Sequence, residues 1–112
     1  MMRAPPPTLE DILAASRVVA GLAGTPGEAL ALAWTIRNRA RRAAMGERRF
    51  GDGSASAAAR SLARDAPGDG AQRAKGRRLL RAAAIVCGVW ADMAPDPTNG
   101  AVAAPMKGWR EA

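Results

Sequence analysis

The stretch TPGEALALAWTI, residues 25–36, constrains the fold of this chain more than any other part of the sequence. Thr25 and Glu28 stand three positions apart with a proline between them, which is the capping-box pattern at the start of a helix. The eight residues that follow include only one polar side chain, so this helix has no polar face suited to contact with water. We therefore expect a central helix that other helices cover on most sides and that ends at Gly46.

A first helix is expected before this central one. Thr8 follows a run of three prolines, and acidic residues stand in the next turn, which is the pattern of an N-cap with a favourable helix dipole. Apolar residues then recur at helical spacing. The pattern predicts a helix over residues 8–20 that ends at Gly21 or Gly24.

A third, shorter helix is expected after the central one. Residues 47–53 have the composition of a loop, and either Ser54 or Ser56 can cap a helix that follows it. This helix is predicted to run to about residue 64, because the sequence DAPGDG at residues 65–70 is a strong break.

The longest amphipathic pattern predicts a fourth helix over residues 72–93, which the turn PDPTNG at residues 95–100 ends. Its buried stripe is expected to comprise Leu79, Ala83, Val86, Cys87 and Trp90. Arginines crowd its first half, and we interpret them as a solvated face. If they line up, they suit phosphate or a wall polymer equally well.

Composition agrees with a helical fold. The chain has 112 residues, enough for one domain with one modest core. Its apolar fraction of 48% is rich in alanine, the best helix former, and includes only three tryptophans and one phenylalanine. We predict an all-α domain of about four helices over residues 8–100, with a flexible Pro-rich lead-in at 1–7 and an irregular tail at 101–112.

Residue types that are missing exclude several kinds of chemistry. The chain has no histidine and a single cysteine, Cys87, so it can form neither an internal disulfide nor a zinc site. Ser-His-Asp and Cys-His mechanisms are excluded for the same reason. Any catalysis must rest on carboxylates, lysines or backbone donors, and neither a metal nor a cofactor is expected.

The net charge of +7 favours a polyanionic partner. Nucleic acid, anionic lipid headgroups and the negatively charged polymers of a bacterial wall would all be attracted, and charge does not choose among them. The arginine and alanine content is also what a GC-rich genome encodes. We find neither a signal peptide nor an apolar run long enough to span a membrane, so we expect a cytoplasmic protein unless other components deliver it to the wall.

Two motifs far apart in the sequence carry a family resemblance. The apolar run of the central helix ends in IRNR at residues 36–39, and the turn after the last helix reads DPTNGA at residues 96–101. Together with DILA at residues 11–14 and with Gly24, in this order and spacing, they resemble the SleB-like bacterial cell-wall hydrolases. In that family a Glu-x-x-Gly-Glu element precedes a buried helix that ends in Asn-Arg, and a late helix leads to an Asp-Pro-Thr-x-Gly-Ala turn.

The resemblance implies a fold and an activity. The fold would be of the lysozyme and lytic transglycosylase type, and the activity would be cleavage of the glycan strands of peptidoglycan. One glutamate serves as general acid and base in that family, and an apolar environment raises its pKa. Counting from Asn38 backwards and from Asp11 forwards places this glutamate at Ala20, and alanine cannot transfer a proton. Glu28 is the nearest acid in the sequence and the remaining catalytic candidate, although it is also the expected capping partner of Thr25.

The resemblance also names residues that would bind substrate. Asn38 could hold an acetamido group or simply be the polar end of a helix. The turn contributes three more candidates, Asp96, Thr98 and Asn99, and Trp109 could be an exposed stacking residue. The family's Phe-Ser-x-Trp stretch has no counterpart here, and Val102 follows the turn where aromatic residues are usual.

We therefore predict a peptidoglycan hydrolase homologue with reduced or lost catalysis, in a phage or prophage type of setting. The alternative is a small basic helical component of a larger particle, either structural or nucleic-acid-binding, which rests on charge alone. A third interpretation is that the fold is reused to bind a partner protein, since a thin core leaves small apolar patches.

Overall fold

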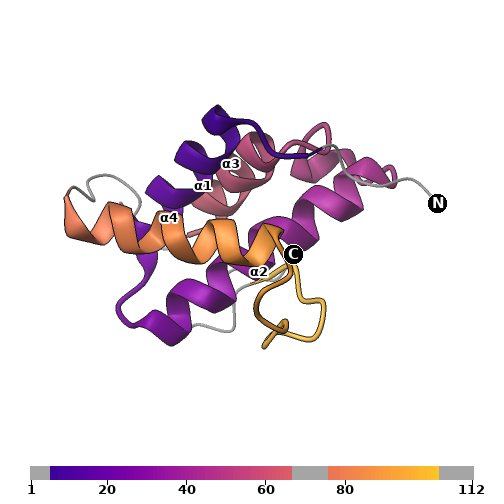
Figure 1. Ribbon diagram of the computed structural model, residues 1–112. Coiled ribbons are helices and arrows are strands. Elements are labelled where there is room, and N and C mark those ends of the chain that lie inside the picture. The colour runs from indigo at the N-terminus through magenta and orange to yellow at the C-terminus, as the bar shows by residue number, and fades with distance from the viewer. Residues whose placement is uncertain (1–5, 67–75, 104–112) are drawn as a thin grey trace.

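The computed structural model describes residues 6–66 and 76–103, and the statements below concern these residues. In this part of the chain all regular structure is helical, which confirms the predicted all-α fold (Figure 1). The elements in order are α1 (Leu9–Leu22), α2 (Pro26–Ala44), the 3₁₀ helix η1 (Arg48–Phe50), α3 (Ala55–Asp65) and α4 (Arg77–Trp90). The predicted lead-in and tail lie largely outside the described residues.

The start of α1 is a capping box, as its sequence predicts. The backbone N–H of Asp11 donates to Thr8 Oγ1 at 3.1 Å, and the N–H of Thr8 donates to the Asp11 carboxylate at 2.9 Å. Of the two predicted ends, Gly21 is wrong because it lies inside the helix, whereas Gly24 agrees with the structure, since α1 ends at Leu22 and Ala23 is its C-cap. The chain leaves the helix only at Ala23, whose N–H still donates to the carbonyl oxygen of Val19 at 2.9 Å.

The start of α2 corrects the prediction in one detail. Thr25 caps the helix by accepting from the Glu28 N–H at 3.1 Å. The Glu28 carboxylate, however, accepts from the N–H of Gly24 at 2.7 Å, one residue before the N-cap, so the capping box is not the reciprocal one expected. The predicted end is confirmed, since α2 stops at Ala44 and Gly46 has a φ of 117°, in the left-handed region.

The boundaries of α3 and α4 show which serine caps and where the last helix stops. Ser54 is the N-cap of α3, and its hydroxyl accepts from Ala57 N–H at 3.1 Å. The expected start of the fourth helix at residue 72 lies outside the described residues. Its expected end at Met93 is wrong, because α4 stops at Trp90 and Asp92 has a positive φ of 58°.

The buried stripe of α4 is rotated relative to the prediction but overlaps with it. Val86 is buried as expected, and Leu79 and Trp90 are partly buried against the core, whereas the buried residues Ala82 and Val89 were not expected. Cys87, expected in the stripe, is exposed. The rotation follows from the position of α4, which packs against α1 and α2 together and therefore buries the face between these two contacts.

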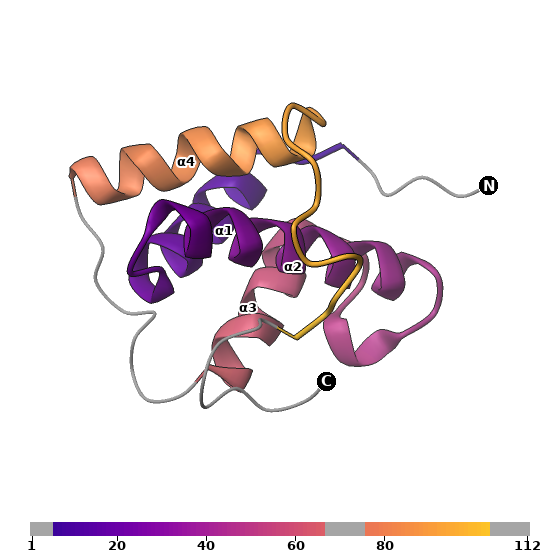
Figure 2. The same cartoon turned by 90° about the horizontal axis from the view of Figure 1, so that it is seen from below.

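The helices form three layers. Figure 2 shows α4 along one side, α1 and α2 in the middle, and α3 on the opposite side. The contacts agree, because α1 and α2 each touch both α3 and α4, whereas the described parts of α3 and α4 do not touch each other. The prediction of a central α2 is confirmed, since α2 contacts every other helical element that the structure describes.

Alanine sets the thickness of the core. The fully buried large side chains at its centre include Val19 of α1, Leu32 and Ile36 of α2, and Leu62 of α3. Between them lie alanines with no exposed surface, which allow the helix backbones to approach closely. Among the described helices, none combines the length and apolar character needed to cross a bilayer.

Candidate functional site

The first polar cluster joins the two motifs that carry the family resemblance. Asn38 is buried in the second half of α2 and is not the helix end that the sequence suggested. Its side-chain amide donates to Asp96 Oδ2 at 3.1 Å and to the carbonyl oxygen of Ala101 at 3.0 Å. It also lies 3.4 Å from the hydroxyl oxygen of Thr98. A side-chain amide has two hydrogens, so these acceptors occupy both of them.

Asp96 organises the turn that Asn38 holds. Its carboxylate accepts from the N–H of Thr98 at 2.7 Å, from the Thr98 hydroxyl at 2.6 Å and from the N–H of Gly100 at 2.9 Å. Partial burial raises the pKa of Asp96, but the donors from Thr98, Asn38 and Gly100 together lower it by more, so the carboxyl is ionised well into the acid range.

The structure brings together only some of the predicted substrate-binding residues. Asn38, Asp96 and Thr98 lie together and bond to one another. Asn99 is exposed at the tip of the turn, with a φ of 54°. Trp109 lies outside the described residues. Trp34 is 6% exposed and belongs to the core, as expected.

A second polar cluster, centred on Arg39, was not predicted. The guanidinium is completely buried, and its Nε donates to the carbonyl oxygen of Val102 at 2.7 Å. Its Nη1 lies 3.0 Å from the Ser61 hydroxyl and 2.8 Å from an Asp65 carboxylate oxygen. The guanidinium carbon is 4.8 Å from the centre of the Phe50 ring. Burial lowers the pKa of Arg39, and the hydrogen bond and charge of Asp65 oppose that shift.

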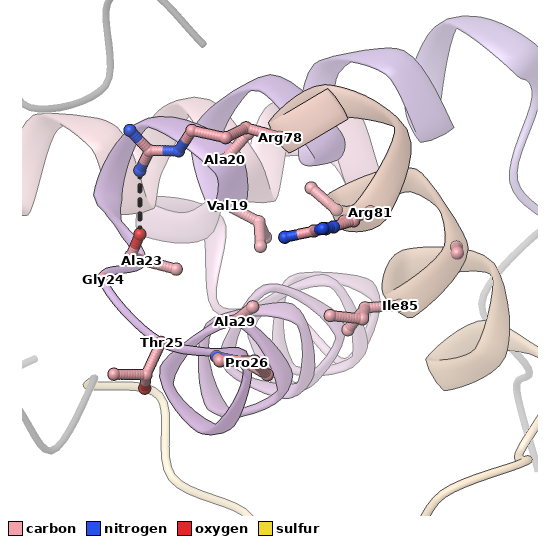
Figure 3. Close-up of a pocket in the computed structure, with 12 residues that line it drawn as sticks. Val19, Ala20, Ala23, Gly24, Thr25, Pro26, Ala29, Arg78, Arg81 and Ile85 are labelled. Atoms are coloured by element: carbon pink, nitrogen blue, oxygen red, sulfur yellow. Dashed lines mark hydrogen bonds between the residues drawn. The ribbon is translucent and has the colours of Figure 1, made fainter. Parts of the chain in front are cut away.

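A pocket of about 380 Å³ lies between the end of α1, the start of α2 and the first half of α4 (Figure 3). We call it the α1/α2/α4 pocket. Its walls from α1 and α2 are mainly apolar, and α4 adds two arginines. The lining residues are Val19, Ala20, Ala23, Gly24, Thr25, Pro26, Ala29, Arg78, Arg81, Ala82, Ala84 and Ile85.

Ala20, the position at which the resemblance expects an acid, is one of these lining residues. Glu28, the remaining catalytic candidate, is not among them, and its carboxylate caps the loop before α2 through Gly24. No carboxylate belongs to the part of the lining that the structure describes. Acid–base chemistry by Asp or Glu therefore has no residue to perform it on the described walls.

The electrostatics of the pocket are positive. Arg78 donates to the carbonyl oxygen of Ala23 at 2.9 Å, which fixes its guanidinium at the rim. Arg81 stands three residues later on the same helix face, and Figure 3 shows its guanidinium pointing from α4 toward Val19. Arg77, Arg78 and Arg81 are all exposed, which agrees with the solvated face that the sequence predicts, and the pocket opens beneath this face.

No protein family, no curated protein and no solved structure matches this chain. Within the residues that the structure describes, His, Cys, Asp and Glu form no group of three or more that could hold a metal ion.

Proposed function

We propose that this protein is a non-catalytic counterpart of the cell-wall hydrolases, which binds the glycan strands of peptidoglycan at the α1/α2/α4 pocket without cutting them. The observation that carries the proposal is the position of Ala20. Two independent counts along the sequence assign the family's catalytic acid to this residue, and Ala20 lines the α1/α2/α4 pocket.

The contact between the two sequence motifs also supports the proposal. Asn38 and Asp96 come from motifs that the resemblance treats as separate signatures, and they are hydrogen-bonded to each other. If the two motifs belong to one scaffold, a direct contact of this kind is expected. Unrelated motifs that match by chance have no reason to meet in space.

The charge of the pocket argues against catalysis. A general acid for glycoside cleavage needs a raised pKa so that it carries a proton at neutral pH. Arg78 and Arg81 line the same pocket, and a positive neighbour lowers the pKa of a carboxyl group. An acid at this place would be ionised, and the arginines themselves do not release protons. Binding without cleavage is therefore the activity that the described residues favour.

The proposal is tested with purified sacculi. The native protein should sediment with them and release no muropeptides. A gain of cleavage is sought in the double variant Ala20→Glu/Arg81→Leu, which introduces the acid and removes one of the two cations that line the pocket. The matched control is Ala84→Glu/Arg81→Leu, which places an acid on the α4 wall of the same pocket. Muropeptide release by the first variant and not by the second would support the assignment of the family's catalytic position to Ala20.

Two results would contradict the proposal. Muropeptide release by the native protein would show that another group catalyses, and Glu28→Gln would be the next variant. Failure to sediment with sacculi would remove the wall-binding function. Binding to duplex DNA that weakens steeply with salt would then favour the nucleic-acid alternative, because phosphate contacts release counterions.

A further inference from the structure

We propose that the α1/α2/α4 pocket is a binding site for a small monocarboxylate with a compact apolar body. Arg81 would hold the carboxylate, and the apolar body would lie on the walls from α1 and α2. This inference concerns the same pocket as the proposed wall binding, but it rests on the pocket's own residues and is tested separately. The two ligands would compete for the pocket.

The first argument is the charge of the lining. Two guanidinium groups face one pocket whose described lining has no carboxylate. The ion pairs of the described residues involve Arg37, Arg39, Arg42 and Arg49. Arg81 is in none of them, so within this part of the chain its charge has no protein counter-ion. An anionic ligand would supply one.

The second argument is the difference between the two arginines. Arg78 already donates to the Ala23 carbonyl oxygen, and this bond keeps its guanidinium at the rim. Arg81 is exposed and points toward Val19, and among the described residues its planar fork of donors has no acceptor (Figure 3). One free fork matches one carboxylate, which guanidinium binds with two parallel hydrogen bonds. The fork can bind phosphate in the same bidentate way, but a phosphate dianion has three acceptor oxygens and a single fork pairs with only two of them, so a carboxylate is the fuller match.

The start of α2 adds to the same field. Thr25 and Pro26, the N-cap and first residue of this 19-residue helix, both line the pocket. The N-terminal end of a helix carries a partial positive charge, which stabilises a nearby anion. This contribution is secondary to the guanidinium of Arg81, and it has the same sign.

The third argument concerns the apolar part of the ligand. Small side chains at Ala20, Ala29 and Ala82 leave the space that larger residues would fill, and Val19 and Ile85 complete the apolar surface. A volume of about 380 Å³ equals roughly a dozen water volumes in the liquid. It therefore suits a ligand of about ten non-hydrogen atoms, at the small end of ligand pockets.

Octanoate is the probe that matches this charge and size. Calorimetric titration of the full chain, below the micellar concentration of the probe, should show saturable binding of octanoate. Octanol has a similar chain and no charge, so its affinity should be lower than that of octanoate by about tenfold or more. Octyl phosphate tests whether the pocket binds a phosphate in place of a carboxylate.

Two arginine variants separate the pocket from the general positive charge of the protein. Arg81→Gln should weaken octanoate binding about tenfold or more, since it removes one charge-assisted pair. Arg77→Gln is the matched control, because Arg77 is an exposed arginine of the same helix that does not line the pocket. It removes the same charge and should leave the affinity within about twofold. Circular dichroism and thermal unfolding verify that both variants fold.

A third variant tests the volume. Ala84 is exposed on α4 and lines the pocket, so Ala84→Leu should fill part of the space without disturbing the core. It should reduce octanoate affinity while leaving the fold unchanged.

Several outcomes would overturn the inference. These are the absence of saturable octanoate binding, equal effects of Arg81→Gln and Arg77→Gln, and octanol binding as tight as octanoate. Tighter binding of octyl phosphate by about tenfold would overturn the choice of carboxylate. Sacculus sedimentation is measured separately, so octanoate binding without sacculus binding would reject the proposed function alone.

Discussion

The side chains of Asn38 and Asp96, separated by 58 positions in the sequence, are joined by a hydrogen bond of 3.1 Å. This bond fastens the turn that follows α4 to the second half of α2. Because Asn38 also donates to the carbonyl oxygen of Ala101, one side-chain amide holds both ends of the turn. The contact makes two distant sequence motifs parts of one structural unit.

Removing this amide should therefore destabilise the fold. Asn38→Ala leaves the acceptors of Asp96 and Ala101 without their donor, which should lower the free energy of unfolding by about 1–3 kcal/mol. Asn99→Gly is the control, because Asn99 is exposed and its φ of 54° suits glycine. Urea denaturation should show a change of only a few tenths of a kcal/mol for the control, or about 0.5 at most. Equal losses for the two variants would contradict the role assigned to Asn38.

Arg39 should matter more for stability than any exposed arginine. Its buried guanidinium bonds to Val102 and to Asp65, which come from two other parts of the chain. Arg39→Ala should cost about 3–5 kcal/mol, because it leaves a buried void and unpaired partners. Arg41→Ala, at an exposed position of the same helix, should change stability by about 0.5 kcal/mol or less. Comparable unfolding midpoints for both variants would show that the buried cluster contributes little.

The acid stability of the protein should depend on Asp11. Partial burial raises the pKa of Asp11, but hydrogen bonds from Ser56 and Thr8 lower it by more, so the pKa lies below its ordinary value. The stability that such a carboxylate contributes is complete above the unfolded value of about 3.9 and is lost as pH falls through the folded value.

Asp11→Asn should accordingly flatten the fall in unfolding free energy below about pH 4. Some slope should remain, because the pKa of Asp96 is also lowered. Ser56→Ala keeps the carboxylate and removes one of its donors, so its curve should lie between those of the native protein and Asp11→Asn. Denaturant titrations between about pH 2 and pH 7 measure these curves. If the unfolding free energies of Asp11→Asn and the native protein fall equally steeply at low pH, Asp11 does not contribute to acid stability.

Alanine substitutions at Gly51 and Gly46 test how closely the loop packs against α3, with Gly46 as the control. Both have a positive φ, of 111° and 117°, so alanine is strained at either position. A Cβ at Gly51 would lie 2.4 Å from the Cβ of Ala57, whereas a Cβ at Gly46 meets nothing within 4 Å. Gly46→Ala should cost about 1–3 kcal/mol from backbone strain. Gly51→Ala should cost about 1–3 kcal/mol more, from overpacking against α3. Equal losses of thermal stability for the two variants would exclude close packing of Gly51 against Ala57.

Cys87 should react as an accessible thiol in the folded protein. Its side chain is exposed on α4, although the sequence pattern placed it in the buried stripe. Ellman's reagent should therefore modify it in native buffer at nearly the rate found in urea. Cys87→Ser should change the free energy of unfolding by about 0.5 kcal/mol or less. A thiol that reacts only after unfolding would disagree with the position of α4.

The helices themselves were predictable because their signals are local. Thr8 and Thr25 cap the helices that the sequence assigns to them, Ser54 is the cap among the two serines that the sequence offers for α3, and Gly46 follows the end of α2. A cap depends on hydrogen bonds between residues three positions apart, so the nearby sequence contains all that is needed. The apolar run of α2 likewise indicated its central place, since a helix without a polar face has to be covered.

The tertiary structure alone decided which faces are buried and which distant groups meet. Cys87 is exposed and Val89 is buried because α4 packs in the groove between α1 and α2, a contact that periodicity within α4 cannot define. Arg39 is buried, against the usual preference of arginine, because acceptors from residues 61, 65 and 102 converge on it. Ala20 and Arg81 line one pocket although they are remote in sequence. Burial and charge pairing depend on long-range packing, and a single sequence does not contain those distances.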